Sequence, residues 1–208
     1  RSSAASDVYK RQRTYSLHWD VVEPGTTSTV FDDGSLRVTA FPLYHRVPCV
    51  GYRFDEVNKR RHIDRESCDY YGVPNFLMNE IKDGADLVLP DGVVVPNERL
   101  TTDPTPPASY AYCSDTAMDM RVAEAVKGVE VLYHESTYGD DGLHKAAPRG
   151  HSTARQAGEI ARAAGAGTLV LGHYSKTIFD EARLASEAAE VFDGKVIAGN
   201  EGIKIDLA

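Results

Sequence analysis

Apolar and polar residues alternate in the first part of the chain with the period of two that is typical of half-buried strands. Pro24-Gly25 and Asp33-Gly34 are turn signals between the alternating segments. The pattern therefore predicts three strands, at Tyr15–Val22, Leu36–Phe41 and Val50–Phe54. Residues 57–70 are polar and charged, and after them we expect a short helix, a turn and a loop, at Val73–Lys82, Pro90–Gly92 and Asp103–Ala108.

From residue 110 onward, short apolar runs alternate with amphipathic segments whose apolar positions recur every three or four residues. The apolar runs predict strands at Tyr110–Cys113, Val129–Tyr133, Thr168–Gly172, Lys195–Ala198 and Ile203–Leu207. The amphipathic segments predict helices at Met118–Val126, Thr153–Ala164 and Glu181–Phe192. Strands followed by a strand–helix alternation are typical of an α/β or α+β fold, with a sheet covered by helices.

The helix predicted at residues 153–164 has the clearest pattern. Ser152 is placed to cap its first turn, and Gly165 to end it. Its apolar residues fall on one face, which we expect to be buried: Ala154, Ala157, Ile160, Ala161 and Ala164.

Composition narrows the class of protein. The 208 residues are 42% hydrophobic and 26% charged, as in an ordinary globular domain, and no apolar run is long enough to span a bilayer. Residues 1–13 resemble a translated cloning adapter and are excluded from the fold prediction. The net charge of −8 disfavours unassisted nucleic-acid binding. Three cysteines without zinc-ligand spacing indicate a reducing cytoplasm and no disulfides.

Candidate chemical groups stand at the carboxyl ends of predicted strands. They are His45, Asp115, the pair His134-Glu135, and His173. Strand ends at one edge of a sheet are where α/β folds place their ligands, and histidine nitrogen and aspartate oxygen suit zinc. Each residue also has a simpler interpretation, as a surface histidine, a helix N-cap or a solvated turn. The combination indicates a metal site more strongly than any one member does.

Five short motifs carry a resemblance to a known family. Phe41–Tyr52 holds a histidine followed by a Gly-Tyr pair, and Ser114-Asp115-Thr116 is similar to an SDT motif. His134–Thr137 resembles a HEAT loop, His151–Thr153 an HST loop, and Gly172–Ser175 the LTHFS motif. In this order, the motifs resemble those of the tRNase Z (ribonuclease Z) family of the metallo-β-lactamase superfamily.

The resemblance implies a fold and a set of roles. The fold would be the second half of an αββα four-layer metallo-β-lactamase sandwich, over residues 14–208. His45 would bind the first of two zinc ions, Asp115 would bridge both, and His173 would bind the second. His151 and Glu135 would be catalytic and transfer a proton to the leaving oxygen.

The chain also departs from the family pattern. The family's principal metal motif, HxHxDH, lies upstream of the position of His45, and residues 14–44 contain nothing similar. His18 alone cannot replace it. We also expect the family's basic arm, which grips the tRNA elbow, to be missing. Thr177 stands where family members commonly have an arginine.

The function implied by the resemblance is zinc-dependent cleavage at the 3′ end of precursor tRNA, by a cytoplasmic homodimer. Without the HxHxDH residues, this chain is expected to be inactive alone. Two alternatives stay open. One is a relaxed-specificity phosphodiesterase or arylsulfatase of the same fold, and the other is a non-catalytic subunit.

Overall fold

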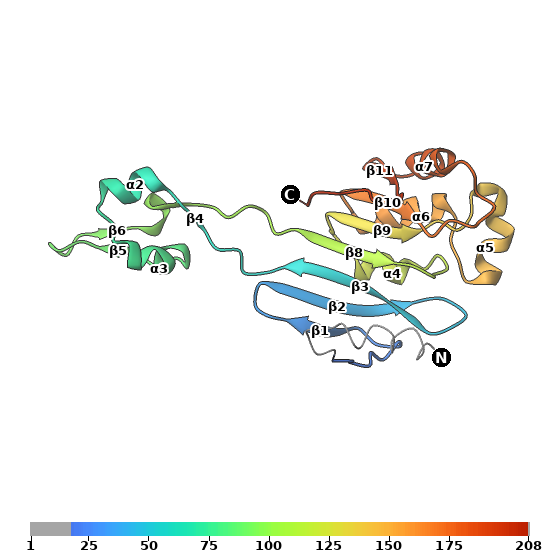
Figure 1. The fold of residues 1–208 in the computed structure, drawn as a ribbon, viewed down its shortest axis with the longest axis horizontal. Coiled ribbons are helices and arrows are strands. Elements are labelled where there is room, and N and C mark those ends of the chain that lie inside the picture. Colours follow the sequence, from blue (N-terminus) through green and yellow to red (C-terminus); the bar gives the residue numbers. More distant parts are fainter. Residues whose placement is uncertain (1–17, 208) are drawn as a thin grey trace, which may run out of the picture.

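The computed structural model describes residues 18–207. The predicted adapter-like segment, residues 1–13, lies outside this range. The described residues contain a seven-stranded sheet with the order β1-β2-β3-β8-β9-β10-β11 (Figure 1). Its strands are β1 Ser28–Asp32, β2 Leu36–Leu43, β3 Cys49–Glu56, β8 Ser109–Cys113, β9 Val131–Glu135, β10 Thr168–Gly172 and β11 Lys195–Ala198.

The sheet changes direction at β8. Strands β1, β2, β3 and β8 pair antiparallel, whereas β8, β9, β10 and β11 pair parallel. Parallel neighbours need a crossover between them, and the crossovers here carry the helices. The helices are α4 Met120–Ala125, α5 Leu143–Arg149, α6 Ala154–Ala164 and α7 Glu181–Ala189, with a 3-10 turn, η4, at Asp140–Gly142.

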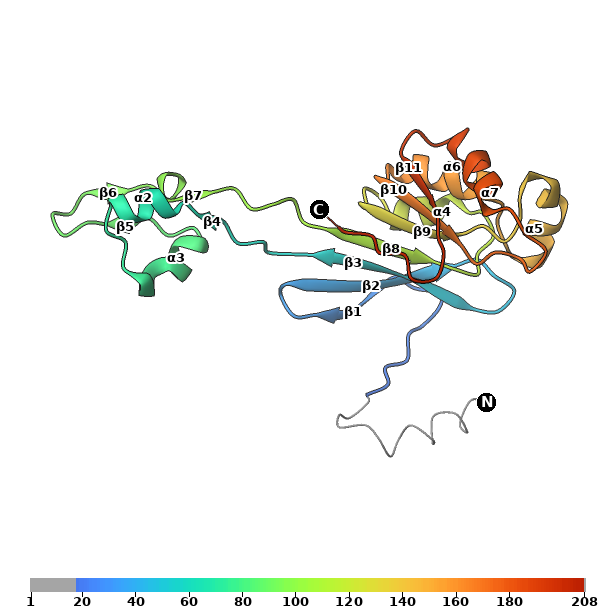
Figure 2. The ribbon, with the colours of Figure 1, turned by 45° about the horizontal axis from the view of Figure 1, so that its top comes forward.

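The main core lies between the sheet and helices α4, α6 and α7 (Figure 2). The predicted apolar face of α6 is confirmed, since all five expected residues are buried. Sheet residues that meet these helices include Phe41, Leu132, Leu169 and Leu171. One sheet covered by helices supplies two layers of an αββα sandwich.

A second unit, residues 57–108, projects from the sheet domain between β3 and β8 (Figure 1). It has its own small core of Cys68, Val73, Ile81, Leu87, Val95 and Leu100. Its elements are β4 His62–Ile63, α2 Arg65–Tyr70, η2 Asn75–Leu77, α3 Met78–Lys82, β5 Leu87–Val88, β6 Val94–Val95, η3 Asn97–Arg99 and β7 Thr101–Thr102. We call this unit the projecting module.

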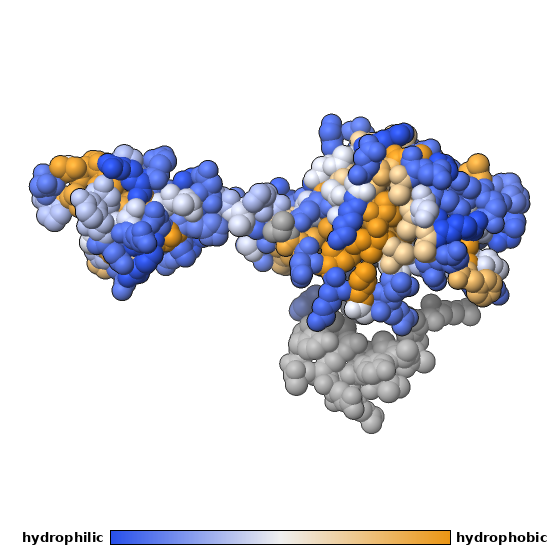
Figure 3. Space-filling model, turned by 90° about the horizontal axis from the view of Figure 1, so that it is seen from above, coloured by the Kyte–Doolittle hydropathy of each residue, from blue (hydrophilic) through white to orange (hydrophobic). Residues whose placement is uncertain are grey.

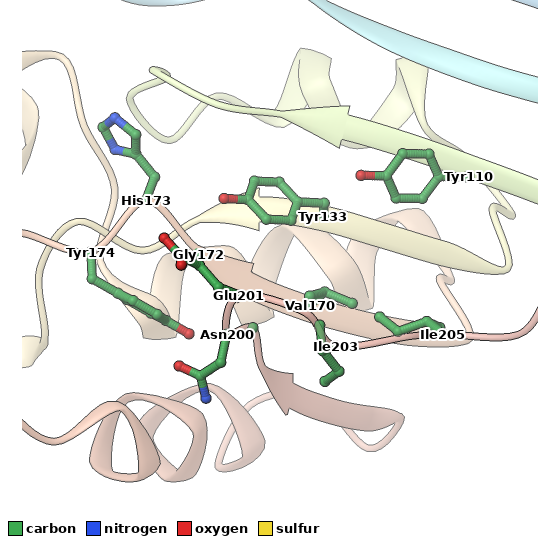
Figure 4. Close-up of a pocket in the computed structure, with 11 residues that line it drawn as sticks. Tyr110, Tyr133, Val170, Gly172, His173, Tyr174, Asn200, Glu201, Ile203 and Ile205 are labelled. Atoms are coloured by element: carbon green, nitrogen blue, oxygen red, sulfur yellow. The ribbon is translucent and has the colours of Figure 1, made fainter.

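Apolar side chains are also exposed on both units, as Figure 3 shows. At the far end of the projecting module these are Val88, Val93 and Val94. On the sheet domain, a cavity of about 380 Å³ opens on the sheet and is lined by Tyr110, Tyr133, Val170, Ile203, Ile205 and neighbouring residues (Figure 4).

Several sequence predictions were wrong in detail. No strand forms at residues 18–22, where Trp19 and Val21 are largely exposed, while the strand at Ser28–Asp32 was missed. Residues 203–207 are not a strand, because the turn at Gly202, with its positive φ, directs the chain along the cavity instead of along β11. Helices α2 and α5 and the short strands β4, β5, β6 and β7 were not predicted. The other differences are shifted or split element ends, as in α4, α7 and the predicted helix at 73–82, which divides into η2 and α3.

The cap of α6 was also assigned to the wrong residue. The Thr153 side chain accepts from the Gln156 amide, and the Gln156 side chain accepts from the Thr153 amide, which is a complete capping box. Ser152 instead donates its hydroxyl proton to the carbonyl of Thr116. Ser152 therefore joins two loops of the sheet edge and does not cap the helix.

A tight contact between α6 and α7 gives a first prediction. A Cβ atom on Gly158 would lie 2.6 Å from the Ala188 carbonyl oxygen. Alanine gains about 1 kcal/mol of helix propensity over glycine, but overpacking against backbone costs about 1–3 kcal/mol. We expect Gly158→Ala to lower the free energy of unfolding by roughly 1 kcal/mol net, measured by urea denaturation.

The control is Gly25→Ala, because a Cβ atom there meets nothing within 4 Å. Its unfolding free energy should change by less than about 0.5 kcal/mol. An unchanged or raised stability of Gly158→Ala would show that α6 and α7 move apart without cost.

Candidate metal centre

The carboxyl ends of β8, β9 and β10 meet at one edge of the sheet, because these strands are parallel neighbours. The loop after β8 carries Asp115, β9 ends at Glu135, and His173 follows β10 directly. His151 comes from the segment just before α6. Ligand atoms of these four residues all lie within 4.8 Å of one another, although 58 positions separate Asp115 and His173 in the sequence.

His45 follows β2 and lies beside this group. Its ring centroid is 4.8 Å from that of His151, and its Nδ1 lies 2.7 Å from the carbonyl oxygen of Gly150. A carbonyl only accepts, so Nδ1 carries the proton and Nε2 keeps its lone pair. Gly150 has φ +75°, and a Cβ atom there would be 2.8 Å from His45 Nδ1. A larger residue would therefore displace His45.

Two residues of the group have strained backbones. Asp115 has φ +58° and His173 has φ +55°, and among the non-glycine residues that the structure describes only Asn58 shares a positive φ. Such conformations cost on the order of 1 kcal/mol or more and persist where surrounding contacts hold them. The Cys49 thiol, whose pKa is raised mainly by burial, donates to the Asp115 carbonyl over 3.2 Å. The fold thus fixes the direction in which Asp115 points.

Glu135 is the most enclosed member, with no exposed surface. One carboxylate oxygen accepts from the Thr116 amide at 2.7 Å and from His151 Nδ1 at 2.9 Å. The other accepts from the Thr137 hydroxyl at 2.5 Å and the Ser152 amide at 3.1 Å. Four donors and the positive end of α6 offset the desolvation of the charge. This carboxylate has its acceptor positions filled by protein, so it is poorly placed to bind a metal.

The same contacts occupy the first amides of α6, which could otherwise attract a substrate phosphate. The amides of Ser152, Thr153 and Ala154 bond to Glu135, Gln156 and the Tyr138 carbonyl. The positive end of the helix therefore acts on the Glu135 carboxylate.

The donor set fits a metal ion. His173 Nε2 lies 3.1 Å from Asp115 Oδ1, and the Nδ1 atoms of His45, His151 and His173 all face protein oxygens. Imidazoles anchored through Nδ1 present Nε2 outward, as metal-binding histidines commonly do. Two imidazoles and a carboxylate are ligands that zinc accepts.

His134 behaves differently from the other strand-end candidates. It is fully buried on the helix side, its Nδ1 bonds the Glu135 carbonyl, and its Nε2 has no hydrogen-bond partner among the described residues. Burial lowers its pKa, so the ring stays neutral in the folded protein. The structure does not bring it into the metal group.

Sequence reasoning missed the residues that hold the group in place. Cys49, Gly150 and Ser152 were not assigned a role there, and neither were Thr116 and Thr137. The two threonines each close a motif, SDT and HEST. The available signal was that a small hydroxyl residue follows Asp115, Glu135, His151 and His173 by one or two positions.

Comparison with known proteins decides the family. The chain is 44% identical over 201 residues to ribonuclease Z of Parabacteroides distasonis, and 44% identical over 193 residues to ribonuclease Z of Bacteroides fragilis. These matches cover 97% and 93% of this chain. The chain belongs to the ribonuclease Z family. It spans 66% and 63% of the lengths of these two relatives.

Solved structures confirm the fold. The metallo-β-lactamase fold protein YhfI of Bacillus subtilis matches with a TM-score of 0.55 at 20% identity, over 96% of this chain and 61% of that one. The short form of human tRNase Z matches with a TM-score of 0.51 at 19% identity, over 88% of this chain and 46% of that one.

No family model matches the chain. Among its described residues, no helix has the length and apolarity required to cross a membrane.

The depressed pKa of His134 gives a second prediction. Above the unfolded-state pKa of about 6.5 the ring is neutral in both states. As the pH falls through that value, the unfolded chain binds a proton that the folded chain cannot bind. The free energy of unfolding then falls by at most about 1.4 kcal/mol for each pH unit. We expect His134→Leu to lose this dependence, measured by urea denaturation at pH 7.5 and 5.5.

His144→Leu, which removes an exposed imidazole, is the control for the loss of one histidine. If wild type and His134→Leu lose equal stability on acidification, the ring is protonated in the folded protein and the assigned pKa direction is wrong.

Proposed function

We propose that the protein containing this chain is a zinc-dependent endoribonuclease that cleaves at the 3′ end of precursor tRNA. Family membership supports hydrolytic RNA processing as the class of reaction. The observation that carries the proposal is the convergence of Asp115, His151 and His173 around the buried Glu135. We also propose that the described sheet domain is the C-terminal part of the metallo-β-lactamase-fold domain.

In this proposal His45, Asp115 and His173 hold zinc. Bound zinc would polarise the phosphodiester and lower the pKa of a water molecule. Both histidines are anchored through Nδ1 and keep Nε2 for the metal. Asp115 lies on the strained turn after β8, where its carboxylate faces His173 Nε2.

His151 and Glu135 form the proposed proton-transfer pair. Glu135 accepts from His151 Nδ1 at 2.9 Å, which fixes the orientation of the ring. His151 Nε2 is then the atom that can carry a proton to the leaving oxygen. Because the Glu135 carboxylate is enclosed by donors, its role is to orient the His151 ring.

We expected the family's basic arm, which grips the tRNA elbow, to be missing, and we propose that the projecting module stands in the place of that arm. It is not basic, however: residues 57–108 contain six Lys and Arg and nine Asp and Glu, a net charge of −3. Its basic cluster is engaged in ion pairs, Lys59 with Glu56, Arg60 with Asp83 and Arg61 with Asp103.

A homodimer acting in the cytoplasm belongs to the same proposal. The family resemblance supports it, and Cys49, Cys68 and Cys113 are free thiols, as a reducing compartment requires.

A third prediction concerns the chain of 208 residues by itself. The sequence contains no HxHxDH motif. His45, Asp115 and His173 alone cannot complete two zinc sites of four ligands each. We expect less than two zinc ions per chain by atomic spectroscopy after dialysis, and no cleavage of a precursor tRNA. Robust cleavage would show that the missing motif is dispensable.

A fourth prediction separates metal ligand from proton donor. It uses a chimera, in which this chain is joined to the part of the Parabacteroides distasonis relative that its match leaves uncovered. Asp115→Ala should lower bound zinc and abolish cleavage together. His151→Ala should keep the zinc and reduce the cleavage rate by a factor on the order of 10²–10⁴, since a proton donor acts mainly in the transition state.

Glu190→Ala, an exposed surface change, is the matched control. Loss of zinc from His151→Ala would make His151 a ligand and overturn its proposed role.

The same chimera distinguishes the alternative functions. Cleavage of simple phosphodiesters but not of precursor tRNA would favour the relaxed-specificity phosphodiesterase. An inactive chimera that still holds two zinc ions would favour a non-catalytic subunit.

A further inference from the structure

Thr137 contacts both halves of the site. Its hydroxyl oxygen lies 2.5 Å from Glu135 Oε2, 3.0 Å from His173 Nδ1 and 3.3 Å from His151 Nδ1. It is also 3.1 Å from the His173 carbonyl. Thr137 is buried, on the loop just after β9, so water does not compete for these contacts.

The single proton of this hydroxyl has one preferred acceptor. The Glu135 carboxylate and the His173 carbonyl both accept, but the carboxylate is charged and closer. Two backbone amides and His151 also donate to Glu135, so both of its oxygens act as acceptors in this network. The threonine hydroxyl therefore donates to Glu135.

With its proton committed, the Thr137 oxygen can only accept from His173 Nδ1. His173 must then carry a proton on Nδ1. Its Nε2 faces Asp115 Oδ1 at 3.1 Å, and only a cation between these two atoms, a proton or a metal ion, makes that approach favourable. The chain of hydrogen bonds runs from His173 through Thr137 to Glu135, and a second bond runs from His151 to Glu135.

We propose that Thr137 is a positioning residue that fixes the Nδ1-protonated form of His173 and thereby presents Nε2 to the metal. The metal half of this inference rests on the proposed function. Thr137 also joins the metal ligand His173 to the proton-transfer pair through one carboxylate, so both are aligned by the same group.

The test uses the metal-free chain of 208 residues, labelled with ¹⁵N in its histidines. Long-range ¹H–¹⁵N NMR correlations distinguish a protonated ring nitrogen from one with a free lone pair. We expect Nδ1 to be the protonated ring nitrogen of His173 in wild type, because it faces the Thr137 oxygen. In Thr137→Val, which removes the hydroxyl, a population with Nε2 protonated and Nδ1 free should appear. Thr137→Ser keeps the hydroxyl and should keep the wild-type pattern.

Zinc is then titrated into the same samples, and the His173 resonances report the dissociation constant. Loss of an outer-sphere partner of a metal-binding histidine typically weakens metal affinity about 10–100-fold. We expect that loss in Thr137→Val and a change of less than about threefold in Thr137→Ser. A purely structural role would not produce a tautomer change that serine reverses.

A free lone pair on His173 Nδ1 in wild type would overturn the proposal, whether or not the variants fold. An unchanged tautomer in folded Thr137→Val would overturn it as well. If the tautomers behave as expected but zinc does not bind wild type, Thr137 keeps its positioning role, and the metal-binding part of the proposed function fails for this chain.

Discussion

The arrangement of the site depends on one buried charge. Glu135 sits at the end of β9 with no exposed surface, and an unpaired carboxylate there would cost several kcal/mol. The donors that offset this cost come from the loop after β8, the loop after β9 and the start of α6. Satisfying one carboxylate therefore fixes three segments relative to one another, and these segments carry Asp115, Thr137 and His151.

The same constraint organises the chemistry. Each of the three imidazoles directs Nδ1 at a protein oxygen, and two of those oxygens belong to or contact Glu135. The Nδ1 atoms of His45, His151 and His173 are thus used in hydrogen bonds within the protein, and their Nε2 atoms are the ones that can contact a metal ion or a substrate. Asp115 and His173 both have positive φ values, and their side chains face each other across 3.1 Å.

The sequence predicted the parts of the structure that depend on local pattern. Strands β10 and β11 and the apolar face of α6 were correct, because continuous apolar runs and a 3.6-residue period report burial directly. The sequence also predicted that residues at the ends of these strands would lie close together, because parallel strands end at the same edge of a sheet. The donors to Glu135 could not be predicted, because two of them are backbone amides, which leave no trace in residue identity. Thr153 caps α6 in place of Ser152, because the Ser152 hydroxyl donates to the Thr116 carbonyl.

The projecting module enters and leaves the sheet at one point. Asp55 pairs with Ser109, and the Glu56 amide donates to the Ala108 carbonyl, so β3 and β8 are already closed as an antiparallel pair at its base. The 52 residues of positions 57–108 form, in topological terms, a hairpin loop with a core of its own. The entropic cost of closing a loop grows only slowly with its length. A loop at this position can therefore vary in length at little cost in stability. The length or charge of this loop can thus change without altering the register of the sheet edge that carries Asp115, Glu135 and His173.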